Sequence, residues 1–341
     1  MHDSKSLSRR DFLKAGLFGT AGLAGIAAAA QSAATGTAKS PAFAPLPSVP
    51  SQDHTGHDLT GTVGDVDTSR FDPMQYLTHF DYGRISRLPT GQTLREWDIT
   101  AVDAEIEVAP GVYFPAWTYN GTIPGPTLRA TEGDRLRVNF YNGGSHPHSI
   151  HFHGIHLPSM DGLQVVGSGD RFVYEFDARP FGLHLYHCHV MPLKRHIHKG
   201  LYGTFIVDPP GGRAPANEMV MMMNGFDTNF DGENEIYAVN TVAFHYERHP
   251  IPLKIGELNR IYLVNITEFD PINSFHLHAG MFKLYRTGTR PDQWEYTDTV
   301  MMCQGERHVL EFTLEYPGRY MIHAHQSELA ELGWLGFLEA G

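Results

Sequence analysis

Four histidine pairs of the form His-x-His constrain the fold of this chain more than any other feature. They are His151/His153, His187/His189, His276/His278 and His323/His325. Residues i and i+2 of a β-strand point to the same face of its sheet. If these segments are strands, each pair presents two imidazoles side by side. Eight imidazoles in such pairs are enough to hold a cluster of metal ions.

The chain also repeats itself at an offset of 136 residues. Glu175-Phe176, Gly182 and His187 in the first half are matched by Glu311-Phe312, Gly318 and His323 in the second. The segment 208–215, rich in proline and glycine, is a breaker between the two copies. Runs such as 97–102 and 135–140 alternate apolar and polar residues, which is typical of antiparallel strands. We therefore predict an all-β protein with two homologous β-sandwich domains, residues 95–208 and 216–341. Met219–Met223 would be the buried first strand of the second.

Composition agrees with a turn-rich β protein. The 341 residues include 35 glycines and 22 prolines, and only 19% are charged. A formal net charge of −12 argues against nucleic acid as a partner. The two cysteines, Cys188 and Cys303, are far apart and do not suggest a disulfide scaffold. We expect Cys303 to be a small buried residue of the core.

The N-terminus predicts export. Residues 8–14 match the twin-arginine motif, and an apolar stretch rich in alanine and glycine follows. We interpret residues 1–44 as a cleaved signal peptide and residues 45–94 as an N-terminal lead-in, whose His54 and His57 would be solvated. A periplasmic or extracellular location follows. Residues 1–44 carry five basic and two acidic side chains, so a chain starting at Pro45 would carry about −15.

Strand alternation divides the first-domain ligands between two faces. In His187-Cys188-His189 the two imidazoles face one way and the thiol faces the other. In the segment 148–153, His148 points away from His151 and His153 and so shares a face with Cys188. A further imidazole follows at His196, with His198 as its rival. Two imidazoles and one thiolate form the ligand set of a blue copper site.

These segments resemble the ligand motifs of the multicopper oxidases. The matching stretches are His148–Gly154, Tyr186–His189 and His196–Gly203, together with the Asn-Gly-Thr-Ile-Pro-Gly-Pro run at 120–126. The resemblance covers about residues 95–341 and is strongest to the two-domain, laccase-like members, which are related to copper nitrite reductases. It implies two cupredoxin-like Greek-key sandwiches.

The resemblance also implies how copper would be held. His148, Cys188 and His196 would bind a type 1 copper, with Leu201 at the axial position. His151 and His276 would bind a type 2 copper. Two type 3 coppers would be held by His153, His187, His189, His278, His323 and His325. In the second domain Asn273 and Ala324 stand where His148 and Cys188 stand in the first, so its type 1 site is lost.

The implied activity is oxidation of a donor at the type 1 copper, coupled to reduction of O₂ to water. The donor would be a phenol, an aromatic amine or a metal ion, and an acidic chain would tolerate cationic donors. The resemblance further implies a homotrimer with each cluster between two chains. Asp161 is the candidate proton relay, Glu328 a weaker one, and His156 an outer support of the ligands.

Other functions stay open at this point. A copper nitrite reductase needs one type 2 copper and three histidines, which would leave five imidazoles surplus. A copper-binding electron carrier without turnover would need only the site at Cys188. A zinc site is the simplest alternative, since histidine and cysteine also bind zinc, but four His-x-His pairs do not match structural zinc spacings.

Overall fold

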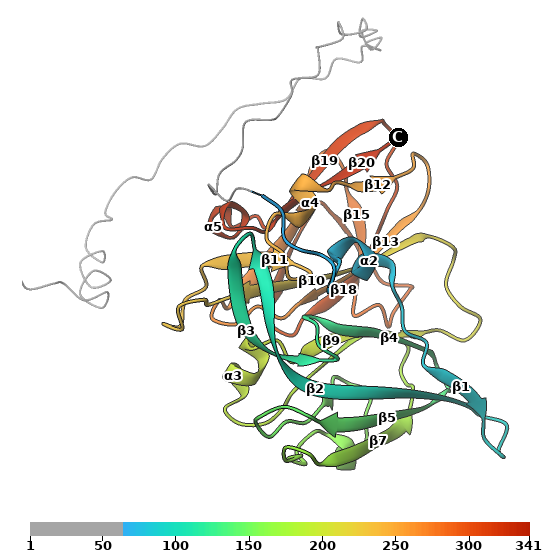
Figure 1. Cartoon of the computed structure of the whole chain (residues 1–341). Coiled ribbons are helices and arrows are strands. Elements are labelled where there is room, and N and C mark those ends of the chain that lie inside the picture. The colour runs from blue at the N-terminus through green and yellow to red at the C-terminus, as the bar shows by residue number, and fades with distance from the viewer. Residues whose placement is uncertain (1–63) are drawn as a thin grey trace, which may run out of the picture. The chain divides into compact units, whose positions relative to one another are not determined.

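The computed structural model describes residues 64–341, and Figure 1 shows that they form two β-sandwiches, one above the other in that view. The predicted signal peptide and most of the lead-in, with His54 and His57, lie outside the described residues. No helix in the described part is long and apolar enough to cross a membrane. The all-β prediction is confirmed.

Domain 1 consists of a five-stranded sheet packed against a four-stranded one. The five-stranded sheet contains β1 (Arg84–Arg87), β2 (Thr93–Ala109), β3 (Val112–Tyr119), β5 (Arg135–Asn142) and β7 (Arg171–Asp177). The four-stranded sheet contains β4 (Gly125–Thr131), β6 (His151–Phe152), β8 (Gly182–His187) and β9 (Tyr202–Asp208). A 3-10 turn (Pro158–Met160) and helix α3 (Leu193–His198) lie in the connections. On β5 every second side chain is buried, which places Leu136, Val138 and Phe140 in the core between the sheets.

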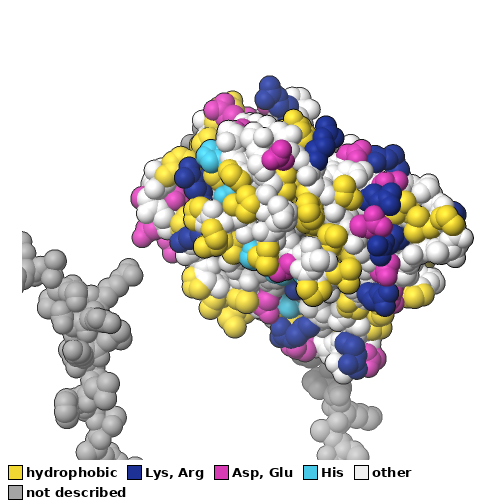
Figure 2. All heavy atoms as spheres, turned by 90° about the horizontal axis from the view of Figure 1, so that it is seen from below, with side chains coloured by type: hydrophobic (Ala, Val, Ile, Leu, Met, Phe, Trp, Pro, Cys, Tyr) yellow, Lys and Arg dark blue, Asp and Glu magenta, His cyan; other side chains and the backbone are white. Residues whose placement is uncertain are grey.

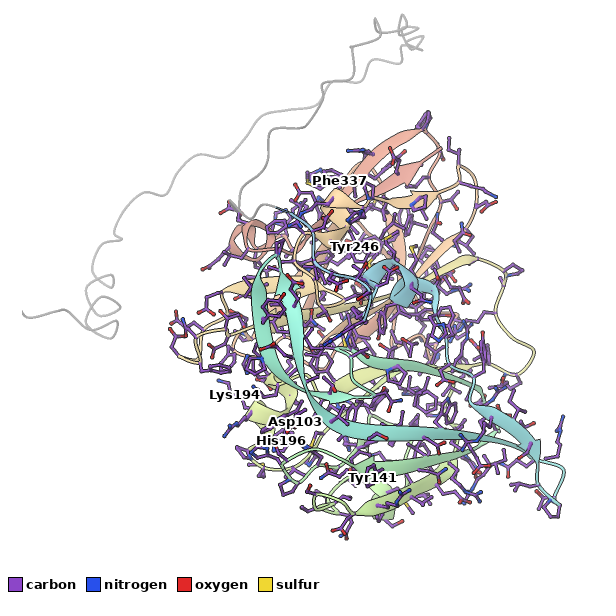
Figure 3. The ribbon with its side chains drawn as sticks, viewed as in Figure 1. Asp103, Tyr141, Lys194, His196, Tyr246 and Phe337 are labelled. Carbon is purple, nitrogen blue, oxygen red and sulfur yellow. The ribbon has the colours of Figure 1, made fainter. Side chains whose placement is uncertain are left out.

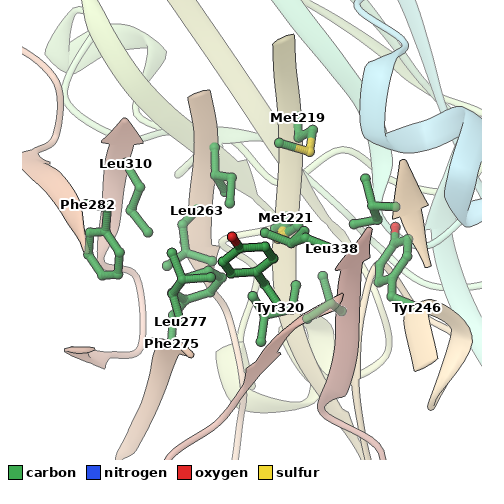
Figure 4. Packing of buried hydrophobic residues seen from close by; sticks show 14 of the residues in the cluster. Met219, Met221, Tyr246, Leu263, Phe275, Leu277, Phe282, Leu310, Tyr320 and Leu338 are labelled. Carbon is green, nitrogen blue, oxygen red and sulfur yellow. The ribbon is translucent and has the colours of Figure 1, made fainter. Parts of the chain in front are cut away.

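Domain 2 repeats this plan with a six-stranded and a five-stranded sheet. The first contains β10 (Asn217–Phe226), β11 (Ile236–Val239), β13 (Asn259–Asn265), β15 (Phe282–Arg286), β16 (Glu295–Thr297) and β18 (Arg307–Phe312). The second contains β12 (Ile251–Leu253), β14 (Ile272–Leu277), β17 (Thr299–Cys303), β19 (Gly318–His323) and β20 (Leu335–Ala340). Helices α4 (His245–Arg248) and α5 (Ser327–Glu331) are short. Met219–Met223 are fully buried on β10, as predicted, and Figure 4 shows two of these methionines in the domain core.

The two domains share a third apolar cluster. Leu183 and Ile206 of domain 1 pack there with Met222, Tyr262 and Val309 of domain 2. A buried ion network continues the contact. The Arg129 guanidinium lies 2.7 Å from Asp208 and 2.6 Å from Glu218 of domain 2, and Glu218 also pairs with Arg260. Because each charge in this network is paired, burial carries a smaller desolvation penalty.

The described part of the lead-in is ordered and contacts both domains. Asp72 caps helix α2 (Pro73–Thr78) through its carboxylate, which accepts a hydrogen bond from the Met74 amide. The hydroxyl of Tyr76 donates to Gly125 of domain 1, and the Pro73 carbonyl accepts a hydrogen bond from Tyr246 of domain 2. Strand β1 then pairs with β2. This segment therefore braces the two sandwiches together.

The expectation for Cys303 is wrong. Its side chain is exposed at the end of β17. Strand alternation explains this, because Val300 and Met302 turn inward while Met301 and Cys303 turn outward.

Candidate metal centres

Two adjacent strands bring the first-domain histidines together. Strand β6 pairs with β8 so that His151 lies opposite His187. In domain 2, β14 pairs with β19 so that His276 lies opposite His323. Each His-x-His pair therefore faces another pair across a strand ladder, at one end of its sandwich.

The first candidate centre contains His148, Cys188 and His196, whose ligand atoms all lie within 4.8 Å of one another. The Nδ1 atoms of His148 and His196 are 3.2 Å apart, and the Cys188 Sγ lies 3.3 Å from the Nδ1 of His196. All three residues are buried. The amide of Ser149 points at the sulfur from 3.4 Å and would stabilise a thiolate there. Two imidazole nitrogens and one sulfur converging in this way fit a type 1 copper.

Burial prepares these groups differently for a metal. Desolvation lowers the pKa of His148 and of His196 to about 4, so both imidazoles are neutral and keep a free lone pair at ordinary pH. Burial raises the pKa of the Cys188 thiol, so the ion must displace its proton. Leu201 is fully buried beside Cys188 in the same cluster, and its carbonyl accepts the Cys188 amide. Its side chain has no lone pair to donate.

The structure separates His196 from its rival His198. Both lie on α3, where residues two apart point in widely different directions. The Nε2 of His198 accepts a hydrogen bond from the Asp227 amide, and its ring packs on Phe114 and Phe269. His198 is thus a contact to domain 2 and not a member of the Cys188 group.

Sequence reasoning missed Trp117, which covers this centre. Its indole ring lies 4.9 Å from the ring of His196 and 5.3 Å from that of His148. It is 6% exposed, so it shields the two ligands from solvent. A tryptophan that arrives from β3, far from the ligand motifs, carries no local signal of this role.

The second candidate centre in domain 1 contains His151, His153 and His187. The Nε2 atoms of His153 and His187 lie 2.8 Å apart, and the ring of His189 lies 5.2 Å from that of His151. Desolvation lowers the pKa of His153 to about 2 and that of His187 to about 4. The Nδ1–H of His187 donates to the Cys188 carbonyl, which leaves its Nε2 lone pair directed at the centre.

Domain 2 holds a matching group of His276, His278 and His323. The Nε2 atoms of His278 and His323 lie 2.9 Å apart, and the ring of His325 lies 5.2 Å from that of His276. The Nδ1–H of His323 donates to the Ala324 carbonyl at 2.6 Å. His278 and His325 are exposed on this chain.

The two groups of four imidazoles stay separate within one chain. Among residues 64–341, no ring contact joins a histidine of one group to a histidine of the other, and the convergent ligand sets of the two groups share no residue. The described chain therefore presents two separate groups of four imidazoles, one in each domain.

The two candidate proton relays differ in placement. The Asp161 carboxylate lies 3.0 Å from the Nδ1 of His151 and 3.2 Å from the Nε2 of His156, and the Asp161 carbonyl also accepts from His151. His156 thus reaches His151 through the Asp161 carboxylate, and its role as an outer support of the ligands stays a prediction. Glu328 is exposed on α5 and has no comparable contact in the described structure. His276 is instead held by the Asp298 carbonyl and the Thr299 hydroxyl.

In domain 2 the place of the Cys188 centre is filled by apolar and amide side chains. Ala324 is fully buried where Cys188 stands in domain 1, and the Asn273 amide is bound to Thr267. The indole of Trp334 is 1% exposed and donates to the Ser274 carbonyl at 3.0 Å. No imidazole or thiol group converges there among the described residues.

Comparisons with known proteins agree with this geometry. A family model described as multicopper oxidase matches residues 101–212, and a second with the same description matches residues 213–338. A solved structure of a multicopper oxidase is 55% identical, with a TM-score of 0.78 over 79% of this chain and 97% of that one.

Curated relatives are more distant. The copper-containing nitrite reductase of Neisseria meningitidis is 28% identical over 66% of this chain and 63% of its own length. A probable nitrite reductase-hydroxylamine oxidoreductase fusion protein of Kuenenia stuttgartiensis is 32% identical over 53% of this chain and 24% of its own length. The chain thus spans less than two thirds of these relatives. The two matched segments together cover most of the described residues, and each contains one of the two groups of four imidazoles. The chain therefore belongs to the multicopper oxidase family.

Proposed function

We propose that this protein is an exported, laccase-like oxidase that couples one-electron oxidation of a donor to four-electron reduction of O₂ to water. One observation carries the proposal: two matching groups of four imidazoles, each with an Nε2 pair less than 3 Å apart. Copper bound at the Cys188 centre would accept electrons one at a time. Copper bound where the two imidazole groups come together would reduce O₂.

The chain's own residues support the other requirements of this chemistry. Cys188 lies between His187 and His189, so one short stretch of main chain joins the two centres. Trp117 and Leu201 exclude water from the Cys188 centre. Asp161 holds the Nδ1–H of His151 and lies where protons are needed, so we assign it the relay role. Glu328 remains a second, weaker candidate.

A copper nitrite reductase is the alternative that the relatives favour. Its single type 2 copper would leave most of the eight imidazoles without a role, whereas here all eight lie in the two groups. Copper analysis separates the two functions. We expect about four coppers per chain and oxygen uptake with a laccase donor. About two coppers per chain, with nitrite reduction, would refute the oxidase.

We further propose that the two halves meet between chains of a homotrimer. They do not meet within one chain, and exposed apolar side chains lie near both. In domain 1 these are Leu157, Leu163 and Val165, and in domain 2 Ile272, Met281 and Met301. On the face of the molecule seen from below in Figure 2, hydrophobic side chains and a few histidines are scattered among charged side chains. Such patches are typical of subunit contacts.

Complementation tests this arrangement. His187→Gln disables one half and His323→Gln the other, so each variant alone should be inactive. Co-expressed, they should regain roughly a quarter of wild-type activity, because in a cyclic trimer a random quarter of interfaces pairs two intact halves. Mixtures as inactive as the separate variants would show that each cluster forms within one chain.

Export by the twin-arginine route is the remaining part of the proposal. Replacing Arg9 and Arg10 by lysine should retain the protein in the cytoplasm, as fractionation would show. Unchanged export of that variant would refute the signal assignment.

A further inference from the structure

A pocket of about 520 Å³ lies beside helix α3, and neither the metal centres nor the trimer proposal uses it. We call it the α3 pocket. One wall is α3 and the residue after it, with Lys194, Arg195 and Lys199; the other wall comes from domain 2, with Phe230 and Phe269. Lys194 lies at the outer edge of α3 in Figure 3, where His196 is also labelled. The volume is within the range of small-molecule sites.

The three cations of the α3 pocket lie next to aromatic rings, and none of them has a carboxylate of the described chain within salt-bridge distance. The Lys194 Nζ lies 4.0 Å from the centre of the Phe269 ring, and the Lys199 Nζ lies 5.0 Å from that of Phe230. Within residues 64–341 no salt bridge of 4 Å or less reaches Lys194, Arg195 or Lys199. Burial, and then the charge of Arg195, lowers the pKa of Lys199 to about 8. Asp227 and Asp231 also line the pocket, so the three cations leave it with a small net positive charge in a chain of net charge −12.

The two lining carboxylates offset part of this charge, but neither forms a salt bridge with the three cations of the pocket. Asp227 accepts the amides of Asp231 and Gly232, and Asp231 accepts that of Glu233, so both are engaged by their own loop. Asp103 and Glu268 act on Lys199 and Lys194 only beyond salt-bridge distance.

The aromatic wall is held in an unusual backbone conformation. Phe230 has φ of 65° and Phe269 has φ of 70°, a region that bulky residues rarely adopt. Phe230 is nevertheless 55% exposed, so burial of its ring does not explain the strain. Strained residues cluster at binding sites because the fold must hold them there. Here the strain presents two ring faces to the pocket.

Trp117 connects the α3 pocket to the Cys188 centre. Arg195 lies 5.2 Å and Lys199 5.9 Å from the Trp117 ring. The same ring also contacts the rings of His196, His148 and the exposed His146. A ligand between the two cations would thus be separated from the ligand imidazoles by one aromatic layer.

We propose that the α3 pocket binds the electron donor, and that the favoured donors are aromatic anions such as phenols with a carboxylate side chain. The carboxylate would pair with Lys194 and Arg195, and the ring would lie against Phe230 and Phe269. Four such phenols would each give up one electron and the hydroxyl proton, and one O₂ would take up four electrons and four protons to form two waters. This inference rests on the proposed oxidase function, and it favours anionic donors, whereas the net charge implied only that cationic donors would be tolerated.

Three donors with the same phenol ring test it: 3-(4-hydroxy-3-methoxyphenyl)propanoate, its amide and the matching amine, 4-(2-aminoethyl)-2-methoxyphenol. Two methylene groups insulate the ring from the charge, so ring oxidation stays comparable. By oxygen uptake we expect kcat/KM to fall from the acid to the amide to the amine, with roughly tenfold between acid and amide from two partly exposed charge pairs. The difference should lie in KM.

The variant Lys194→Gln/Arg195→Gln should bring the acid-to-amide ratio of kcat/KM to about one. Lys254→Gln/Arg290→Gln removes the same charge from exposed sites elsewhere and should keep the ratio. Calorimetric titration with 3-(4-methoxyphenyl)propanoate, which lacks the oxidisable hydroxyl, should show binding that weakens about tenfold in the first variant only.

A ratio that is equal in wild type and in the pocket variant, or a wild-type preference for amide or amine, would overturn the pocket assignment while oxygen uptake continued. Absence of oxygen uptake with every donor, ferrocyanide included, would instead overturn the oxidase function itself.

Discussion

The pocket behind His187 in domain 1 and the pocket behind His323 in domain 2 share one backbone frame and differ in content. The Cys188 amide donates to the Leu201 carbonyl, and the Ala324 amide donates to the Trp334 carbonyl. The amide of His189 reaches the Ser149 hydroxyl, and that of His325 reaches the Ser274 hydroxyl. By these contacts Trp334 occupies the place of Leu201. The same two hydrogen bonds are thus made in both domains, beside a ligand set in one and beside an indole ring in the other.

The two domains show that these hydrogen bonds form whether or not the side chains between them are metal ligands. The facing imidazoles are kept in both domains, with ring distances of 4.9 Å for His153–His187 and 5.0 Å for His278–His323. The two domains differ in the side chains that point to the opposite face, away from these imidazoles. Variants of paired positions can therefore break or sharpen the contrast.

The largest effect is expected at the cysteine. Cys188→Ser should abolish the visible absorption of the type 1 copper and reduce oxygen uptake to background, because no thiolate remains to hold the copper that would accept the donor's electrons. Ala324→Ser, its counterpart, should leave both unchanged. Circular dichroism would show whether each fold is intact. Full activity of Cys188→Ser would refute the electron path.

A smaller loss of activity is expected at Asp161, the proposed proton relay. Asp161→Asn removes the carboxylate that holds His151 and His156, and should lower kcat about 100-fold, the usual contribution of a positioned acid or base. Glu328→Gln in domain 2 should change kcat less than about twofold, because Glu328 is exposed and contacts no ligand. Copper content of Asp161→Asn must be unchanged. Equal losses in both variants would contradict the asymmetry of the halves.

The next largest effect is expected on the free energy of unfolding. Trp334→Ala should reduce the free energy of unfolding by about 3–5 kcal/mol, because it empties the filled pocket of domain 2 and leaves the Ser274 carbonyl unpaired. Trp294→Ala, at a half-exposed tryptophan of the same domain, should cost about 0.5 kcal/mol or less. Denaturant unfolding measures both. Similar losses would mean that Trp334 does not replace the missing centre as packing.

The smallest effect is expected on the reduction potential of the type 1 copper. Leu201→Met offers a thioether to the type 1 copper and should lower its reduction potential by on the order of tens of millivolts, since a sulfur donor stabilises Cu(II). Leu263→Met makes the same exchange at a buried site of β13 in domain 2, and should leave the potential unchanged. A rise or no change for Leu201→Met in potentiometric titration would remove Leu201 from the axial position.

Local periodicity carried most of what the sequence predicted. Strand parity divided Cys188 from His187 and His189, and the repeat identified Ala324 and Asn273 as replacements. Parity failed where the strand ended: it made His198 equivalent to His196, whereas α3 turns them apart.

Contacts between distant segments carry no such signal. Trp117 comes from β3 and Phe269 from domain 2, and only the tertiary fold brings them to α3. The burial of Cys303 was predicted wrongly because residue type alone does not tell which face of an edge strand a side chain takes.

The carbonyl that orients each facing imidazole belongs to the residue after it, Cys188 in one domain and Ala324 in the other. A main-chain atom is present whatever side chain follows. A duplicated gene could therefore discard the cysteine of one copy in a single step without loosening the histidine beside it. The two domains could therefore diverge at this position while each kept its facing imidazole in place.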